Sequence, residues 1–173
     1  MKTFLLGLLF LGFTNLTFSQ NNMAYVDVSS EIDFIKIRKA APVAINSSYI
    51  NSFAAVDISK RILSFQNVAA YYNIKSNEVY TEDKPTTYDV VFQEANNRIE
   101  NVYDQSGEIL SSKQSYKAIK LPYSLSSKVA EQHPGWSIKQ VACSIAYLQG
   151  EPLDIHYKVK LKKGYRTKTL KIE

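Results

Sequence analysis

Apolar and polar residues alternate most regularly from Leu153 to Leu161, where every second side chain is apolar. Such alternation is typical of a strand with one buried and one solvated face. The same period of two recurs at 88–92, 99–103 and 141–147. Shorter strands are predicted at 108–113 and 165–172. Turn residues separate these stretches, namely Glu94–Asn97, Asp104–Gly107, Gly150–Pro152 and Gly164.

Two stretches have a helical period instead. Apolar side chains recur with spacings near 3.6 from Leu63 to Tyr72, which predicts a helix over about 58–73 with Asp57 as its N-cap. A second helix is predicted to begin at Leu121-Pro122, because Pro is tolerated in a first helical turn and Leu125 and Val129 lie four residues apart. His133-Pro134-Gly135 ends it.

The order of elements is therefore helix, three strands, helix, three strands. This order predicts an α+β fold in which helices pack on one face of an antiparallel sheet. A helix followed by a three-stranded meander occurs twice, so we expect two repeats, at about 58–116 and 117–173, within one domain over 58–173.

The segment before this domain is ambiguous. Ile32, Phe34 and Ile37 fit a short strand and a short helix about equally. After Pro42, the spacing of Ile45, Tyr49 and Phe53 indicates a short helix or a turn-rich packing segment. Residues 20–57 are therefore an N-terminal extension of uncertain structure.

The first 19 residues have the layout of a cleavable signal peptide: a cation at Lys2, an apolar stretch from Phe4 to Phe13 and a polar end. The apolar stretch is shorter than the roughly 20 residues that span a bilayer, so we expect no integral membrane segment in the mature chain. Cleavage leaves 154 residues (173 − 19) and lowers the formal charge from +5 to +4, since Lys2 is the only charged residue removed. We therefore expect a periplasmic or secreted protein.

The second half of the chain resembles the PepSY-like, beta-lactamase-inhibitor-like family of exported bacterial proteins. The resemblance rests on Tyr88–Phe92, Ile99–Asp104, Ser106–Leu110, Lys120-Leu121-Pro122 and His133-Pro134-Gly135-Trp136. It implies a helix-plus-antiparallel-sheet fold, a periplasmic or surface location, and a binding or inhibitory role rather than catalysis. An inhibitory activity against beta-lactamases is not carried over, since a shared shape does not fix a function.

The residues themselves show no catalytic set, and we expect no enzyme, no cofactor and no metal site. The two histidines, His133 and His156, lack the spacing of metal ligands. Cys143, the single cysteine, is in phase with Val141 and Ile145 and is expected in the core, where a thiol behaves as a small hydrophobe. No glycine-rich phosphate loop occurs.

The candidate contact surface is basic. Alternation places Lys158, Lys160 and Lys162 on one face of a strand, with His156 beside them and Arg166 shortly after. This face suits a protein partner or, alternatively, an anionic envelope glycan or lipid, whereas a solvated strand that discourages aggregation is the simpler interpretation. Nucleic acid is not expected as a partner. The functional hypothesis is a binding or inhibitory module that recognises a protein through its sheet face.

Overall fold

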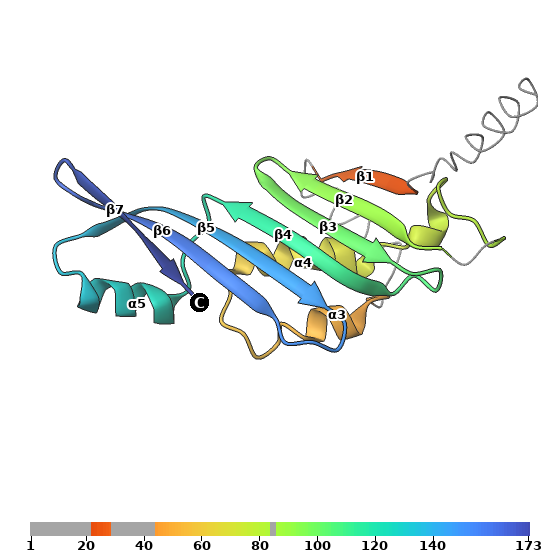
Figure 1. Cartoon of the computed structure of the whole chain (residues 1–173), viewed down its shortest axis with the longest axis horizontal. Helices are drawn as coiled ribbons and strands as arrows, with labels where there is room; N and C mark the ends of the chain where they lie inside the picture. Colours follow the sequence, from red (N-terminus) through yellow and green to blue (C-terminus); the bar gives the residue numbers. More distant parts are fainter. Residues whose placement is uncertain (1–21, 29–43, 84–85) are drawn as a thin grey trace, which may run out of the picture.

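The computed structural model describes residues 22–28, 44–83 and 86–173. Within these ranges it contains α3 (Ser47–Asn51), α4 (Lys60–Tyr71), α5 (Tyr123–Gln132) and a short 3₁₀ turn, η2 (Ile74–Ser76). The described strands are β1 (Met23–Asp27), β2 (Tyr88–Glu94), β3 (Asn97–Tyr103), β4 (Ile109–Lys117), β5 (Ser137–Leu148), β6 (Asp154–Lys163) and β7 (Arg166–Ile172). They form one sheet in chain order, with α3 and α4 behind it in Figure 1 and α5 beside its C-terminal strands.

The sheet is antiparallel from β2 to β7, and only β1 pairs in parallel, with β2. The predicted α+β class is therefore confirmed, as is the sequence helix, meander, helix, meander. The two meanders join through β4 and β5, which pair from Ser111 with Leu148 to Lys117 with Ala142. The helix α5 lies between these two strands in the chain and therefore forms the connection between the two meanders.

The core lies on the helix-bearing face of the sheet. Tyr49 and Phe53 from the α3 region, Ile62 and Phe65 from α4, and Val129 from α5 are all buried in one apolar cluster. The strands contribute the alternating apolar residues that the sequence pattern predicts, including Tyr88, Val90, Phe92, Ile99, Tyr103, Val141, Cys143, Ile145, Tyr157, Val159 and Leu161. Burial of this apolar surface is the main stabilising term of the fold.

Parts of the N-terminal extension belong to this core. Ala24 and Val28 are buried at the β1 edge, and Tyr49 is fully buried. Residues 22–28 and 44–57 are thus packed into the domain. The expected signal peptide and the ambiguous stretch from Ile32 to Ile37 lie outside the described residues.

The N-cap of α4 differs from the prediction. Ser59, not Asp57, occupies the cap, and its hydroxyl accepts a hydrogen bond from the backbone N–H of Ile62 at 3.4 Å. Both residue types cap well, but the helix begins at Lys60, so Asp57 lies too far upstream. Its carboxylate instead accepts a hydrogen bond from the Ser124 hydroxyl at the start of α5, at 2.5 Å.

A buried polar network joins the helices to the middle of the sheet. Gln114 on β4 accepts from the Gln66 amide at 2.9 Å and from the Tyr116 hydroxyl at 2.7 Å. Its own amide donates to the Tyr49 hydroxyl at 2.8 Å and to Ser112 at 3.0 Å. One side chain therefore ties α3, α4 and β4 together.

The end of α5 is fastened to β7. Gly135, at φ 76°, lets the chain turn after the helix, in agreement with the predicted stop. The Lys168 ammonium lies 2.9 Å from Nδ1 of His133 and 4.6 Å from the centre of the Trp136 ring. This cation–π contact orients Lys168 toward the helix side of the sheet.

Candidate functional site

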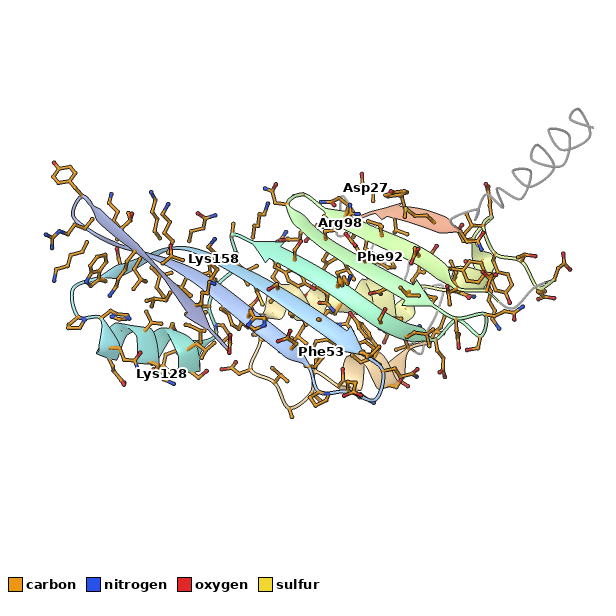
Figure 2. The ribbon with its side chains drawn as sticks, in the orientation of Figure 1. Asp27, Phe53, Phe92, Arg98, Lys128 and Lys158 are labelled. Atoms are coloured by element: carbon orange, nitrogen blue, oxygen red, sulfur yellow. The ribbon has the colours of Figure 1, made fainter. Side chains whose placement is uncertain are left out.

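The sequence-predicted lysines lie on the sheet face opposite the helices. Along β6, His156, Lys158 and Lys162 are exposed and Lys160 is half-buried, whereas the residues between them face the core. Figure 2 shows Lys158 on this strand, well separated from Lys128 on α5. Arg166 pairs with Lys163 at the β6–β7 turn, so by alternation it faces away from the three lysines. The structure brings four of the five candidate residues together and leaves Arg166 apart.

A groove of about 500 Å³ crosses β4 to β7 on this outer face. Its floor carries the small side chains of Ser115, Ala142 and Ser144, which lie on adjacent strands. Small residues let a bound chain approach the sheet closely. The neighbouring Tyr116, Cys143 and Tyr157 are buried with their side chains on the core side, so they border the groove through their backbone.

Lysines flank this floor in a single row. Lys117 on β4 is paired with Ala142 on β5, Ala142 with Lys158 on β6, and Lys158 with Lys171 on β7. All three lysines line the groove and are exposed. Lys158 and Lys171 are direct cross-strand neighbours, an arrangement of like charges that destabilises a sheet.

In the described part of the chain, no carboxylate forms an ion pair with these three lysines; Glu173 also lines the groove, where it contacts His156. Among residues 22–28, 44–83 and 86–173, the ion pairs are Arg61–Glu94, Arg98–Glu100 and those of His156, and none includes Lys117, Lys158 or Lys171. We define these three residues together with Ser115, Ala142 and Ser144 as the basic groove. Its positive charge is available to a ligand.

His156 is already occupied at the edge of the basic groove. Its Nε2 lies 2.7 Å from an Asp154 oxygen, and its Nδ1 lies 3.5 Å from a Glu173 oxygen. These contacts orient the imidazole between two carboxylates. We therefore place His156 at the border of the groove. The lysines are the groups in the groove that could pair with an anion.

The Cys143 thiol is not prepared for nucleophilic chemistry. It is buried, as the sequence pattern predicts, and burial raises its pKa to about 12. A thiolate is the reactive form, so a thiol held neutral is inert at physiological pH. In the part of the chain that the structure describes, no three His, Cys, Asp or Glu side chains gather as a metal site.

Among the residues of the basic groove, the sequence-predicted contact residues include only Lys158, on β6. Lys117 and Lys171 are remote from each other in the chain, and their strands meet only through β5 and β6. The serines and alanine of the floor have no distinctive signal in the sequence. Strand register was the missing information.

Within the described ranges, none of the helices combines the length and apolar character needed to cross a membrane. Comparison of the chain with protein-family models, curated proteins and solved structures finds no match.

Proposed function

We propose that the protein is a non-enzymatic binding or inhibitory module that recognises an acidic segment of a protein partner on its outer sheet face. The observation that carries this proposal is the row Lys117, Lys158, Lys171 across a groove with a small-residue floor. Carboxylates placed in the basic groove would pair with these lysines and relieve the repulsion between Lys158 and Lys171.

Protection against aggregation accounts for only part of this pattern. Lysines on an edge strand discourage pairing with another sheet, and β7 is such an edge. Lys117 and Lys158, however, lie on β4 and β6, which are paired on both sides. Edge protection does not require charge there, whereas binding across the sheet does.

The dimensions of the groove favour a peptide segment. A volume of about 500 Å³ lies in the range of sites that enclose a few side chains of a ligand. The sheet supplies a rigid platform, and the floor of Ser115, Ala142 and Ser144 leaves room for the backbone of an extended chain. Specificity then comes from the spacing of acidic side chains along that chain.

The proposed location and family agree with this role. We propose that residues 1–19 direct export and that the protein acts in the periplasm or after secretion, as the signal-like N-terminus indicates. Membership of the PepSY-like, beta-lactamase-inhibitor-like family is supported by the motifs between Tyr88 and Trp136. A fold of helices packed on an antiparallel sheet is the arrangement that this resemblance implies.

An anionic glycan or lipid is the second candidate ligand. The observation in its favour is that Lys160 and Lys162 continue the positive charge beyond the basic groove. Such a ligand needs charge rather than a shaped floor. A substitution that changes the shape of the groove floor but not its charge should therefore weaken binding of a peptide and leave binding of a glycan or lipid unchanged.

The test measures binding of three probes by calorimetry: a short glutamate-rich peptide, a sulfated glycan and phosphatidylglycerol vesicles, each at low and high salt. The charge variant is Lys117→Gln/Lys158→Gln/Lys171→Gln. Its matched control is Lys60→Gln/Lys75→Gln/Lys128→Gln, which removes the same charge from exposed positions away from the groove. Ser144→Leu changes the floor without changing charge.

We expect the peptide to bind, and the charge variant to weaken it about tenfold, since three exposed ion pairs at about 0.5 kcal/mol each amount to roughly one decade in affinity. The matched control should bind as the parent does, and Ser144→Leu should weaken the peptide. If Ser144→Leu leaves all binding intact while glycan or vesicles bind more tightly than peptide, the second candidate replaces the first.

A further inference from the structure

One end of the sheet is exposed to solvent on both faces. The first four residues of β5, Ser137–Gln140, are all exposed, as are Lys162 and Lys163 at the end of β6 and Arg166 at the start of β7. Strand register brings these residues together, since Ser137 pairs with Lys162 and Lys163 with Arg166. In Figure 1 the turn between β6 and β7 stands clear of α5 at this end of the sheet. The β6–β7 hairpin therefore projects beyond the hydrophobic core.

A tyrosine occupies the tip of this hairpin. Gly164 and Tyr165 form the two-residue turn between β6 and β7, and Gly164 has the positive φ, 57°, that suits the first position of such a turn. We call Lys162–Arg166 the hairpin apex. Tyr165 is fully exposed and is not part of the apolar core cluster. The apolar surface of its ring can therefore be buried only against another molecule.

Positive charges surround the ring on both faces of the hairpin. Alternation places Lys162 on the outer face of the sheet, and Lys163 and Arg166 on the helix-bearing face. Within the described residues, none of the ion pairs includes any of these three side chains. The neighbouring sequence supplies no acid either, because Asp and Glu are absent from 133–150 and from 155–172. The hairpin apex thus presents an aromatic ring among cations that no carboxylate neutralises.

Lys163 is held beside the turn without losing its charge. Its ammonium donates a hydrogen bond to the carbonyl oxygen of Pro134 at 3.4 Å, and a carbonyl leaves the positive charge in place. Lys168, further along β7, differs, because its ammonium lies 4.6 Å from the centre of the Trp136 ring and fastens the hairpin to the end of α5. One lysine therefore anchors the hairpin, while the other remains available at the apex.

The chemistry of the hairpin apex favours a lipid surface. Positive charge on both faces suits a surface that is negative all around the point of contact, and a layer of anionic headgroups has this property. Tyrosine is enriched at membrane–water interfaces, where its ring meets apolar surface and its hydroxyl stays hydrated. Lysine and arginine have long apolar stems, so their charged ends can reach phosphates while the turn lies at the interface.

We propose that the hairpin apex docks the protein on an anionic lipid surface. The Tyr165 ring would enter the headgroup region, and Lys162, Lys163 and Arg166 would pair with lipid phosphates. This contact is separate from the basic groove, which lies further from the turn along the same strands. A protein docked in this way keeps the basic groove open to its own ligand.

The first experiment measures co-sedimentation of the full chain with phosphatidylglycerol vesicles and with phosphatidylcholine vesicles, each at low and high salt. Lys163→Gln/Arg166→Gln removes charge from the hairpin apex and leaves the basic groove unchanged. Its matched control is Lys60→Gln/Lys75→Gln, at exposed positions on α4 and η2. All variants share the same N-terminus, so any contribution from residues 1–19 is common to them.

The second experiment places a fluorophore at the turn. Trp136 is the single tryptophan of the chain, so Trp136→Phe/Tyr165→Trp has its only indole at the hairpin apex. The matched control is Trp136→Phe/Tyr123→Trp, because Tyr123 at the start of α5 is also highly exposed, at 85 %. Quenching by brominated lipids measures how deeply each indole enters the bilayer, and circular dichroism verifies that both variants fold as the parent does.

We expect binding to phosphatidylglycerol vesicles that weakens at high salt, and little binding to phosphatidylcholine vesicles. Lys163→Gln/Arg166→Gln should weaken binding about 25-fold, because each basic side chain near an anionic surface contributes about fivefold in affinity. Lys60→Gln/Lys75→Gln should bind nearly as the parent does. Brominated lipids should quench the indole at position 165 and not the one at position 123.

Four outcomes would overturn the proposal. They are no binding of phosphatidylglycerol vesicles by the parent, equal weakening by the apex variant and its matched control, equal quenching of the two indoles, and vesicle binding that the groove variant Lys117→Gln/Lys158→Gln/Lys171→Gln loses while the apex variant keeps it. The last outcome would assign the lipid to the basic groove. The apex variant should bind the acidic peptide nearly as the parent does, so the two proposals can fail independently.

Discussion

Lys158 on β6 lies directly opposite Lys171 on β7, on the sheet face that carries no helix. Neither ammonium has a carboxylate partner among the described residues. A sheet gains nothing in stability from two like charges at this position, and this repulsion is the basis of the binding role that we propose for the pair.

Lys171→Glu should convert this repulsion into attraction. We expect the free energy of unfolding to rise by about 0.5 kcal/mol at low salt and by less at high salt, because salt screens exposed charges. The same change should weaken binding of the acidic peptide, because it replaces one attractive charge with a repulsive one. Urea unfolding at two salt concentrations measures the first effect and calorimetry the second.

Lys139→Glu is the control for this prediction. It changes the net charge equally but lies at the irregularity between Ile138 and Gln140, where β5 has no opposite residue in the register. A stability gain as large in Lys139→Glu as in Lys171→Glu would mean that overall charge, not the cross-strand pair, is responsible.

Gln114→Leu should destabilise the fold by about 3 kcal/mol. The substitution leaves the buried Gln66 amide and the Tyr49 and Tyr116 hydroxyls without their partner, and each unpaired buried group carries a desolvation cost. The midpoint of urea unfolding measures the loss. Gln132→Leu, at an exposed position at the end of α5, should shift the midpoint little.

Ser59→Ala should lower the free energy of unfolding by about 1 kcal/mol, since it removes the side-chain acceptor at the start of α4. Ser64→Ala, on the exposed face of the same helix, should have no such cost. Thermal unfolding followed by circular dichroism distinguishes the two. Equal effects would show that Ser59 does not act as a cap.

Stability should fall as pH rises above about 9. Burial raises the pKa of the Cys143 thiol from its ordinary value of 9.0 to about 12. Between these values the unfolded chain has lost this proton while the folded chain keeps it, so the unfolded state binds fewer protons and is favoured by rising pH. One such group gives a slope of about −1.4 kcal/mol per pH unit.

Urea unfolding between pH 7 and pH 11 measures this slope. Above pH 10 it should steepen, because burial also raises the pKa values of Tyr49, Tyr103 and Tyr116. Cys143→Ala should lower stability at every pH by leaving a cavity, yet flatten the curve between pH 9 and 10. An unchanged slope in that interval would assign the pH dependence to other groups.

Periodicity was sufficient for the regular part of the fold. The alternation from Leu153 to Leu161 predicted β6 and its buried face correctly. Successive side chains of a strand point to opposite faces of the sheet, so every second residue lies on the buried face. The residue types of Asp104–Gly107 also predicted the turn that the structure has there, with Gly107 at φ 92°. Local patterns of this kind do not depend on what packs against them.

The missed features all depend on distant contacts. The parallel pairing of β1 with β2 brings Met23 beside Asp89, and nothing in either stretch specifies the other. The basic groove depends on the register of four strands, β4 to β7. The side of the sheet on which Arg166 lies also depends on the β6–β7 turn, because the turn sets its pairing with Lys163.

The chain-order sheet also determines how the molecule responds to tension. β7 pairs only with β6, from Ile172 opposite Tyr157 to Arg166 opposite Lys163, so a force applied at the C-terminal end loads the ladder one residue pair at a time. Removing β7 makes β6 the next edge, and the same geometry repeats. Tension applied at this end should therefore break the β6–β7 hydrogen bonds in succession before it reaches the strands of the first meander.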